Sequence, residues 1–381
     1  MASEESVGVA LSSDRDARRA GLLAAAEAAA RPGRDKVKAV LVFASGGHAP
    51  KAADIARGAA EHLPEATVVV IGGNGVVTSE EEADEGAAVS ALALPFPLTV
   101  APVAQLRHEE EAEAAGKEVA ATLLHRPMRP LLFFARPSAL SELLLATLSQ
   151  ELPETPVAGG GLAADGALAV VTPDAGLVEV AAVGIRIDGG LRMLVGASPG
   201  VELLNDWSTV DAVDKGFVRR LGGRPPLERL SVAVSSRNDR PLVLAAIRSR
   251  GDEQGSWMVR AISGVEPSSG SIHIGSAVKA GDQLCFATLS PDDARDHFEL
   301  TLRRMHRDLR GGVPVAAVFI DCAGRGARLY GRKGVDVRAV RRRFDGLCFA
   351  GVRSSFEVAP FDGEPKSQMY TAVLALIYAP S

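Results

Sequence analysis

The chain has 381 residues, too many for one ordinary hydrophobic core, so we expect two domains or two halves. Hydrophobic residues make up 47% and charged residues 23%, a composition that is typical of a globular protein and excludes a disordered chain. The net charge of −5 argues against a nucleic-acid partner. The densest basic run, Arg341 to Arg343, is typical of the solvated face of a helix, with a phosphate patch as the alternative.

The N-terminal segment and the cysteines indicate in which cellular compartment the protein is expected. Residues 1–14 are acidic and polar and contain no apolar run of the signal-peptide type. No stretch approaches the ~20 apolar residues that span a bilayer. Cys285, Cys322 and Cys348 match no zinc or CxxC spacing, so free thiols in a reducing environment are the simplest interpretation. We therefore expect a cytoplasmic protein without membrane contact.

Strand-like and helix-like segments alternate through the first half of the chain. The predicted elements are a helix at 15–30, a strand at 37–44, a helix at 50–62, strands at 67–71 and 87–94, a helix at 109–124, a strand at 131–135 and a helix at 138–152. The acidic stretch 79–86 is predicted to be a solvated loop. This βαβ rhythm predicts a sheet covered on at least one face by helices.

After residue 156 the pattern changes to alternating runs with tight turns. The predicted elements are strands at 177–187, 191–196, 241–248, 258–262, 271–278 and 283–288, a helix at 291–309, a strand at 315–320, a helix at 335–344 and strands at 347–352 and 370–378. A glycine and proline cluster at 221–226 predicts a domain boundary. We expect an α+β protein of two related halves, each a mixed or mainly antiparallel sheet flanked by helices.

Four segments, in the right order, resemble the FIST (F-box and intracellular signal transduction) family. They are VVVIGGNGVV with a returning AVSALALP, the linker LGGRPPLERL, the long run Trp257 to Leu289, and VAAVFIDCAGRGARLYG with a closing YTAVLAL. The resemblance implies a FIST N-terminal domain at 34–222 and a FIST C-terminal domain at 223–381, preceded by a segment and helix at 1–33. Because four ordered motifs match, the resemblance is specific.

Membership implies a sensory role in signal transduction, with small molecules such as amino acids as ligands. Family members include bacterial proteins with fused signalling domains, some that bind haem, and eukaryotic proteins that act with the ubiquitin-ligase machinery. We expect a bacterial, cytoplasmic member with no room for a fused kinase or cyclase domain. Its output is therefore expected to pass through a separate signalling protein.

Three departures from the family pattern bear on the ligand. Phe356 stands where a glycine is usual, and Ala197 stands where a cysteine is frequent. A histidine and glycine that usually precede the last strand are absent near Met369. These departures indicate a specialised pocket.

The turn from Asp321 to Gly326 is the main candidate site, because ligands bind beyond the carboxyl ends of strands in open α/β sheets. Arg325 could clamp a carboxylate or phosphate in a bidentate manner, and Cys322 beside it could have a lowered pKa. The alternative is a structural turn in which Arg325 pairs with an acid such as Glu357. The predicted ligand-binding residues are Cys322, Gly324, Arg325, Gly326, Arg353 and Glu357 from the second half, with Gly73, Asn74 and Gly75 from the first.

The function predicted from the sequence is therefore small-molecule sensing, with an anionic or amino-acid-like ligand. The alternative is a haem-binding sensor or an enzyme that uses His48 or a reactive Cys322. His48 follows a glycine turn at a strand end, where it is either a haem ligand or a solvent-facing turn residue. The turn at Gly72 to Gly75 lacks the spacing of a dinucleotide site and the lysine of a P-loop. We predict no catalytic residues and no metal ligands, and the cofactor stays open.

Overall fold

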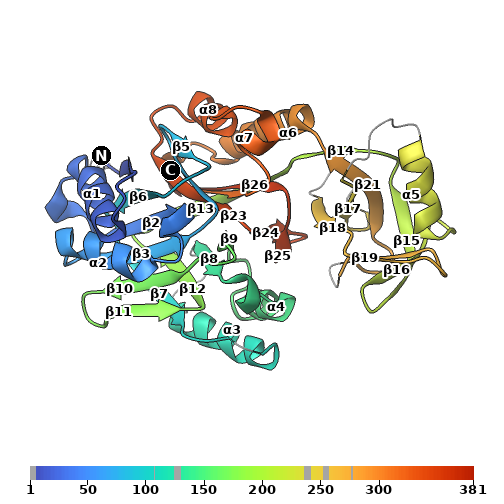
Figure 1. Ribbon diagram of the computed structural model, residues 1–381, viewed down its shortest axis with the longest axis horizontal. Helices are drawn as coiled ribbons and strands as arrows, with labels where there is room; N and C mark the ends of the chain where they lie inside the picture. The colour runs from blue at the N-terminus through green and yellow to red at the C-terminus, as the bar shows by residue number, and fades with distance from the viewer. Residues whose placement is uncertain (1–5, 107, 124–129, 236–241, 252–256, 276–277) are drawn as a thin grey trace.

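The protein consists of a larger and a smaller unit, which Figure 1 shows side by side. The structure, a computed structural model, describes the chain except residues 1–5, 107, 124–129, 236–241, 252–256 and 276–277. The chain leaves the larger unit at Gly200 and returns at Ser290, and the backbone N–H of Ser290 donates to the carbonyl of Gly200 over 3.3 Å. The predicted α+β class is confirmed, since mixed and antiparallel sheets are flanked by helices in both halves.

Three six-stranded sheets build the larger unit. The first sheet has the order β1 (Gly8–Ser12), β6 (Ala88–Leu94), β2 (Ala39–Ser45), β3 (Thr67–Gly72), β10 (Leu168–Thr172), β11 (Gly176–Val180). The second has the order β7 (Leu98–Val103), β12 (Ala182–Ile187), β8 (Leu131–Ala135), β9 (Val157–Gly161), β24 (Glu357–Phe361), β25 (Glu364–Gln368). The third has the order β13 (Arg192–Pro199), β26 (Thr371–Ala379), β22 (Val313–Cys322), β23 (Phe349–Ser354), β4 (Gly75–Thr78), β5 (Glu82–Ala83).

One strand plan recurs in all three sheets. Each has a central parallel pair, β2 with β3, β8 with β9, or β22 with β23. Each sheet also has a two-stranded hairpin at one edge. Along the chain, this hairpin comes directly after the central pair of another sheet. The hairpin after β3 lies in the third sheet, the hairpin after β9 in the first, and the hairpin after β23 in the second. This cyclic exchange binds the two halves of the chain into one unit.

Helices cover the outer face of each sheet, and the inner faces pack on one another. The α-helices of the larger unit are α1 (Ala17–Ala30), α2 (Ala52–His62), α3 (Glu110–Leu123), α4 (Glu142–Glu151), α6 (Pro291–Asp308), α7 (Ala327–Tyr330) and α8 (Val335–Arg343), with short 3-10 helices at Arg34–Lys36, Gly46–His48 and Pro137–Ala139. Phe43 and Phe134, from different sheets, meet edge to face at 6.2 Å between ring centroids in the common core.

Small side chains let the helices of this alanine-rich chain approach closely. A Cβ atom at Gly21 of α1 would lie 2.3 Å from the carbonyl oxygen of Ile55 in α2. One at Gly58 of α2 would lie 1.9 Å from the carbonyl oxygen of Arg18. The low aromatic content is therefore compatible with a dense interior, because backbone contacts and alanine methyl groups fill the space between the helices.

The smaller unit is a single sheet with one helix. It contains β14 (Val201–Leu203), β15 (Ser208–Asp214), β16 (Phe217–Leu221), α5 (Pro226–Ser235), β17 (Leu244–Arg248), β18 (Met258–Ala261), β19 (Gly264–Glu266), β20 (Ser271–His273) and β21 (Gln283–Leu289). The domain boundary predicted at residue 222 falls within this unit, between β16 and α5. Arg260 joins the unit to α4 through an ion pair with Glu142 at 2.5 Å.

Most predicted elements are present, but several differ. The strand predicted at 177–187 is divided into β11 and β12, which lie in different sheets. The helix predicted at 138–152 is divided into a 3-10 turn and α4, and the strand predicted at 271–278 ends at His273. Leu124, Pro241 and residues 276–277, at the limits of three predicted elements, lie outside the described residues. Arg341 and Arg342 are exposed on α8, as predicted. The solvated loop predicted at 79–86 is wrong in part, because it contains β5 and two carboxylate side chains, of Glu82 and Asp84, that are 3% and 10% exposed.

Candidate functional site

The candidate site lies at the carboxyl ends of β22 and β23. These strands run in parallel, with Asp321 beside Arg353 and Cys322 beside Ser354. The predicted turn begins at Ala323, because β22 continues through Cys322. Alternation along the strands then sends Asp321 and Arg353 toward the helices and Cys322 and Ser354 toward the common core.

Arg353 holds the acidic segment of the first half against the third sheet. Its guanidinium contacts Glu82 at 3.0 Å and Asp84 at 2.9 Å, and it also donates to Asp321. The side chains of Arg353 and Glu82 are each 3% exposed. The prediction of a solvated loop failed here because the arginine needs counter-charges in a place that water does not reach. Burial raises the pKa of Glu82, and the charge of Arg353 opposes that rise.

Arg325 is buried at 2% exposure and is incompletely paired. Its Nε lies 2.9 Å from Asp321 Oδ1, and its Nη2 contacts Asp336 at 3.2 Å and donates to the Tyr330 hydroxyl at 2.8 Å. Among the described residues, neither Nε nor Nη1 has a hydrogen-bond partner, although Nε lies within ion-pair distance of Asp321. Nη1 faces Gly200, where a Cβ atom would lie 2.6 Å from it. The alternative prediction that Arg325 pairs with a nearby acid is confirmed, but the acids are Asp321 and Asp336 and not Glu357.

Glu357 lies on the inner face and is fully buried. Its carboxyl group accepts hydrogen bonds from the Ser354 hydroxyl at 2.7 Å and from the Thr371 N–H at 3.2 Å. Burial raises the pKa of Glu357 to about 8, while the hydrogen bonds from Ser354 and Thr371 and the charge of Arg325 oppose the shift. The carboxyl group therefore keeps its proton around neutral pH.

Comparison of the three sheets shows that the fold does not require these charges. The strand registers place Glu357 where the first sheet has Leu168 and the third has Val76. The same registers show that Ala44 and Gly72 of the first sheet occupy the positions that correspond to Asp321 and Arg353 of the third. Small or apolar residues therefore suffice at matching positions of the same strand plan.

Cys322 does not have the properties of a nucleophile. The side chain is buried, and burial raises the pKa of its thiol to about 12, with Glu357 adding to the rise. The lowered pKa predicted from the neighbouring arginine is wrong, because the desolvation of Cys322 outweighs the charge of Arg325. At neutral pH the group is a thiol and not a thiolate.

The structure brings the predicted residues of the first half next to those of the second. The N–H of Asn74 donates to the carbonyl of Arg353 at 2.8 Å, and Gly75 pairs with Arg353 in the sheet. A Cβ atom at Gly73 would lie 2.0 Å from Val352 Cγ2, so this crossing between sheets requires glycine. Gly326 has a φ of 61° and turns the chain beneath Arg353.

Several residues of this cluster were not predicted from the sequence. They are Glu82, Asp84, Gly200, Tyr330, Asp336, Ser354 and Thr371. The sequence contains one signal for two of them: Glu82 and Asp84 are two residues apart, so in a strand both side chains point to the same face. Phe356, the departure from the family glycine, packs its ring against Gly161, where a Cβ atom would lie 2.2 Å from the ring.

His48 is buried and not solvent-facing. It is 1% exposed in a 3-10 turn, and its Nε2 lies 2.7 Å from the carbonyl oxygen of Asp14. The prediction of a solvent-facing turn residue is wrong, because the segment before α1 covers the ring. The same contact occupies one ring nitrogen, so the haem-ligand interpretation gains no support from this geometry.

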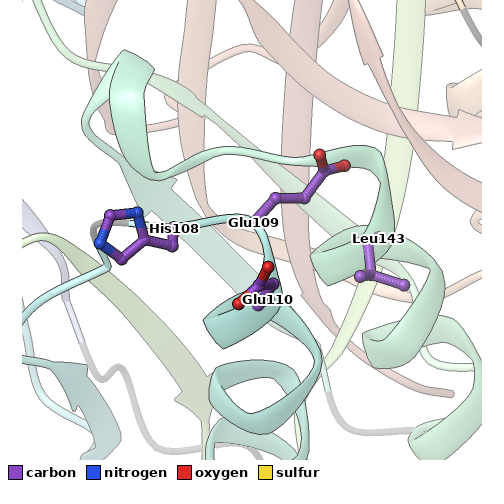
Figure 2. Close-up of a pocket in the computed structure, with 4 residues that line it drawn as sticks. All are labelled: His108, Glu109, Glu110 and Leu143. Carbon is purple, nitrogen blue, oxygen red and sulfur yellow. The ribbon is translucent and has the colours of Figure 1, made fainter.

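Three cavities lie elsewhere in the larger unit. The first, of about 660 Å³, is lined by His108, Glu109, Glu110 and Leu143 and is shown in Figure 2. A second, of about 680 Å³, opens beside Phe96 and Val313, and a third, of about 560 Å³, lies beside Leu63. None of these three is lined by the nine predicted ligand-binding residues.

The described part of the chain contains no metal site and no membrane-spanning helix. No group of three or more histidine, cysteine, aspartate and glutamate side chains is placed to hold a metal ion there. No helix in the same residues is long and apolar enough to cross a bilayer.

Known proteins resemble this chain along almost its whole length. An uncharacterized protein of Mycobacterium tuberculosis strain H37Rv is 27% identical over 97% of this chain and 99% of its own length. An uncharacterized protein of Mycobacterium bovis is 28% identical over 97% of this chain and 98% of its own. The FIST N domain model matches residues 38–224, and the FIST C domain model matches residues 227–360. The chain therefore belongs to the FIST family, whose domains are sensory domains of signal transduction.

Proposed function

We propose that this FIST protein is a cytoplasmic sensor that binds a small anion or zwitterion and signals through a separate protein. The observation that carries the proposal is the buried Nη1 of Arg325, which has no hydrogen-bond partner in the part of the chain that the structure describes. A buried N–H group without an acceptor destabilises the fold, so such groups normally have a partner. A ligand carboxylate or phosphate would supply the acceptor.

The surroundings of this group fit a ligand better than a structural role. Asp321, Asp336 and Tyr330 hold the other side of the guanidinium in a fixed direction. The face toward Gly200 has no side chain of its own. Glu357 is close enough to Arg325 to feel its charge, and its pKa of about 8 lies near neutral pH. Its carboxyl group could therefore exchange a proton with a ligand amine or carboxyl group.

The position of the site also suggests how binding would be transmitted. Gly200 and Ser290 are the two points where the chain passes between the larger and the smaller unit. Tyr370, which packs on the smaller unit's core, lies beside Gly324 in the turn that carries Arg325. A ligand at Arg325 would therefore favour one arrangement of the two units, and a partner could recognise that arrangement.

The test is thermal unfolding of the purified chain with L-glutamate, glycine, succinate or inorganic phosphate as the added probe. A probe at ~100 times its Kd is expected to stabilise the protein by roughly 2.7 kcal/mol. Gly200→Ala should abolish that gain, because the added methyl group fills the space before Arg325 Nη1. Gly47→Ala is the matched control, since a Cβ atom at Gly47 meets nothing within 4 Å.

The two variants separate the outcomes. A probe that stabilises the parent and Gly47→Ala but not Gly200→Ala supports the site. Equal stabilisation of both variants places the ligand elsewhere. No stabilisation of the parent by any of the four probes at millimolar concentration would contradict an anion or zwitterion ligand at Arg325.

A further inference from the structure

A hollow opens at the opposite end of the three-sheet core, where the segments that join one sheet to the next come together. Its volume is about 680 Å³. Phe96 lies between β6 and β7, and Leu191 lies between β12 and β13. Val7 precedes β1, and Cys348 precedes β23. All three sheets therefore contribute to this hollow, which we name the core mouth.

The core mouth is separate from the site at Arg325. The strand β22 begins at Val313, in the wall of the core mouth, and ends at Cys322, in the cluster with Arg325. Ten residues of extended chain cover roughly 30 Å at about 3.3 Å per residue. A ligand in the core mouth would therefore not touch Arg325 or Glu357.

The walls of the core mouth are mostly apolar. Phe96 belongs to the inner core, and Leu191 packs against it. Val313 keeps 62% of its surface exposed, although it begins a central strand. A cavity of this volume falls in the range of roughly 300–1,000 Å³ that is typical of small-molecule sites.

One positively charged side chain, that of Arg31, lines the core mouth. Arg31, at the end of α1, donates from Nη1 to the Cys348 sulfur at 2.9 Å. Burial raises the pKa of the Cys348 thiol, against the effect of Arg31, so the sulfur is uncharged and does not neutralise the guanidinium. Glu80 also raises the pKa of that thiol, but among the described residues no carboxylate forms an ion pair with Arg31.

We propose that the core mouth binds a small amphipathic monocarboxylate. Its apolar chain would lie against Phe96, Leu191 and Val313, and its carboxylate would accept hydrogen bonds from Arg31. The single cation favours one negative charge, and the apolar walls favour a hydrocarbon chain over a polar metabolite. This site goes beyond the sensory site at Arg325 and does not depend on it.

The experiment is isothermal titration calorimetry of the full chain with decanoate and, separately, with decanol. Decanoate is expected to bind about tenfold more tightly, because only the carboxylate gains the charge-assisted hydrogen bonds. Arg31→Gln should remove this preference and leave decanol binding unchanged. Arg34→Gln, a substitution of an exposed arginine in the neighbouring cavity, should keep the preference.

A second variant tests the wall without endangering the fold. Val313→Asp places a carboxylate in the core mouth at a largely exposed position and should weaken decanoate binding about tenfold. Val232→Asp, at an exposed valine of the smaller unit, is the matched control. The proposal is overturned if decanoate fails to bind, if decanoate and decanol bind equally to the parent, or if Val313→Asp and Val232→Asp bind decanoate alike.

Discussion

The two ends of the three-sheet core differ in chemistry although the same strands reach both. At the carboxyl ends of β22 and β23, two buried arginines and four carboxylates close the surface. At the other end, short connections such as Pro95 to Pro97 leave an apolar hollow open beside Arg31. The comparison indicates that buried ion pairs cover the core at one end, whereas apolar side chains remain open to solvent at the other.

The largest effect is expected from Arg353→Met, which keeps an apolar stem and removes the charge. Three carboxylates, Asp321, Glu82 and Asp84, would lose their shared cation in a place closed to water. Breaking such a buried cluster costs about 3–5 kcal/mol, which urea unfolding would measure. Arg342→Met is the control, because Arg342 pairs with Glu299 at the surface and is 61% exposed. Similar losses in both variants would show that the charged end does not close the core.

An effect of a few kcal/mol that depends on pH is expected from Glu357→Gln. The folded pKa of about 8 lies above the ordinary value of 4.5, so the folded state holds the proton more tightly than the unfolded chain. The parent should therefore lose stability as the pH rises from 4.5 to 8. Each unit of pKa shift corresponds to about 1.4 kcal/mol.

Glutamine carries no charge at any pH, so Glu357→Gln should lack this loss. Its advantage in unfolding free energy should grow from pH 5 to pH 8. Urea unfolding at several pH values measures the difference. A constant difference between Glu357→Gln and the parent over this interval would mean that Glu357 is ionised in the folded protein, and that the charged end does not hold a proton.

The smallest effect concerns the thiols at the two ends. Cys348, which is 6% exposed, borders the core mouth beside Arg31, whereas burial and Glu357 raise the pKa of the Cys322 thiol, which is 7% exposed, to about 12. Iodoacetamide at neutral pH should therefore label Cys348 several-fold faster than Cys322, as peptide mass spectrometry would show. The urea-unfolded chain, in which the cysteines should react alike, is the control. Faster labelling of Cys322 would place an open and reactive site at the charged end.

Local pattern was sufficient for much of the fold. The apolar runs at 39–45 and 131–135 and the amphipathic helix at 291–308 are found close to where the sequence predicts them. Periodicity and capping act over a few residues, so the sequence reveals them directly. The family motifs likewise located the turn of Cys322 to Gly326 and the crossing at Gly73 to Gly75, because glycine is required where backbones meet.

The partners of the charged residues depended on the tertiary structure alone. Glu82 and Asp84 look like part of a solvated acidic loop until the exchanged hairpin carries them to Arg353, about 270 residues further along the chain. The exchange of hairpins among three sheets is a long-range choice that local sequence does not encode. The pKa of Glu357 and the unpaired Nη1 of Arg325 follow from burial that only this packing creates. The sequence therefore determined the elements and the family, and the tertiary structure decided which charges meet.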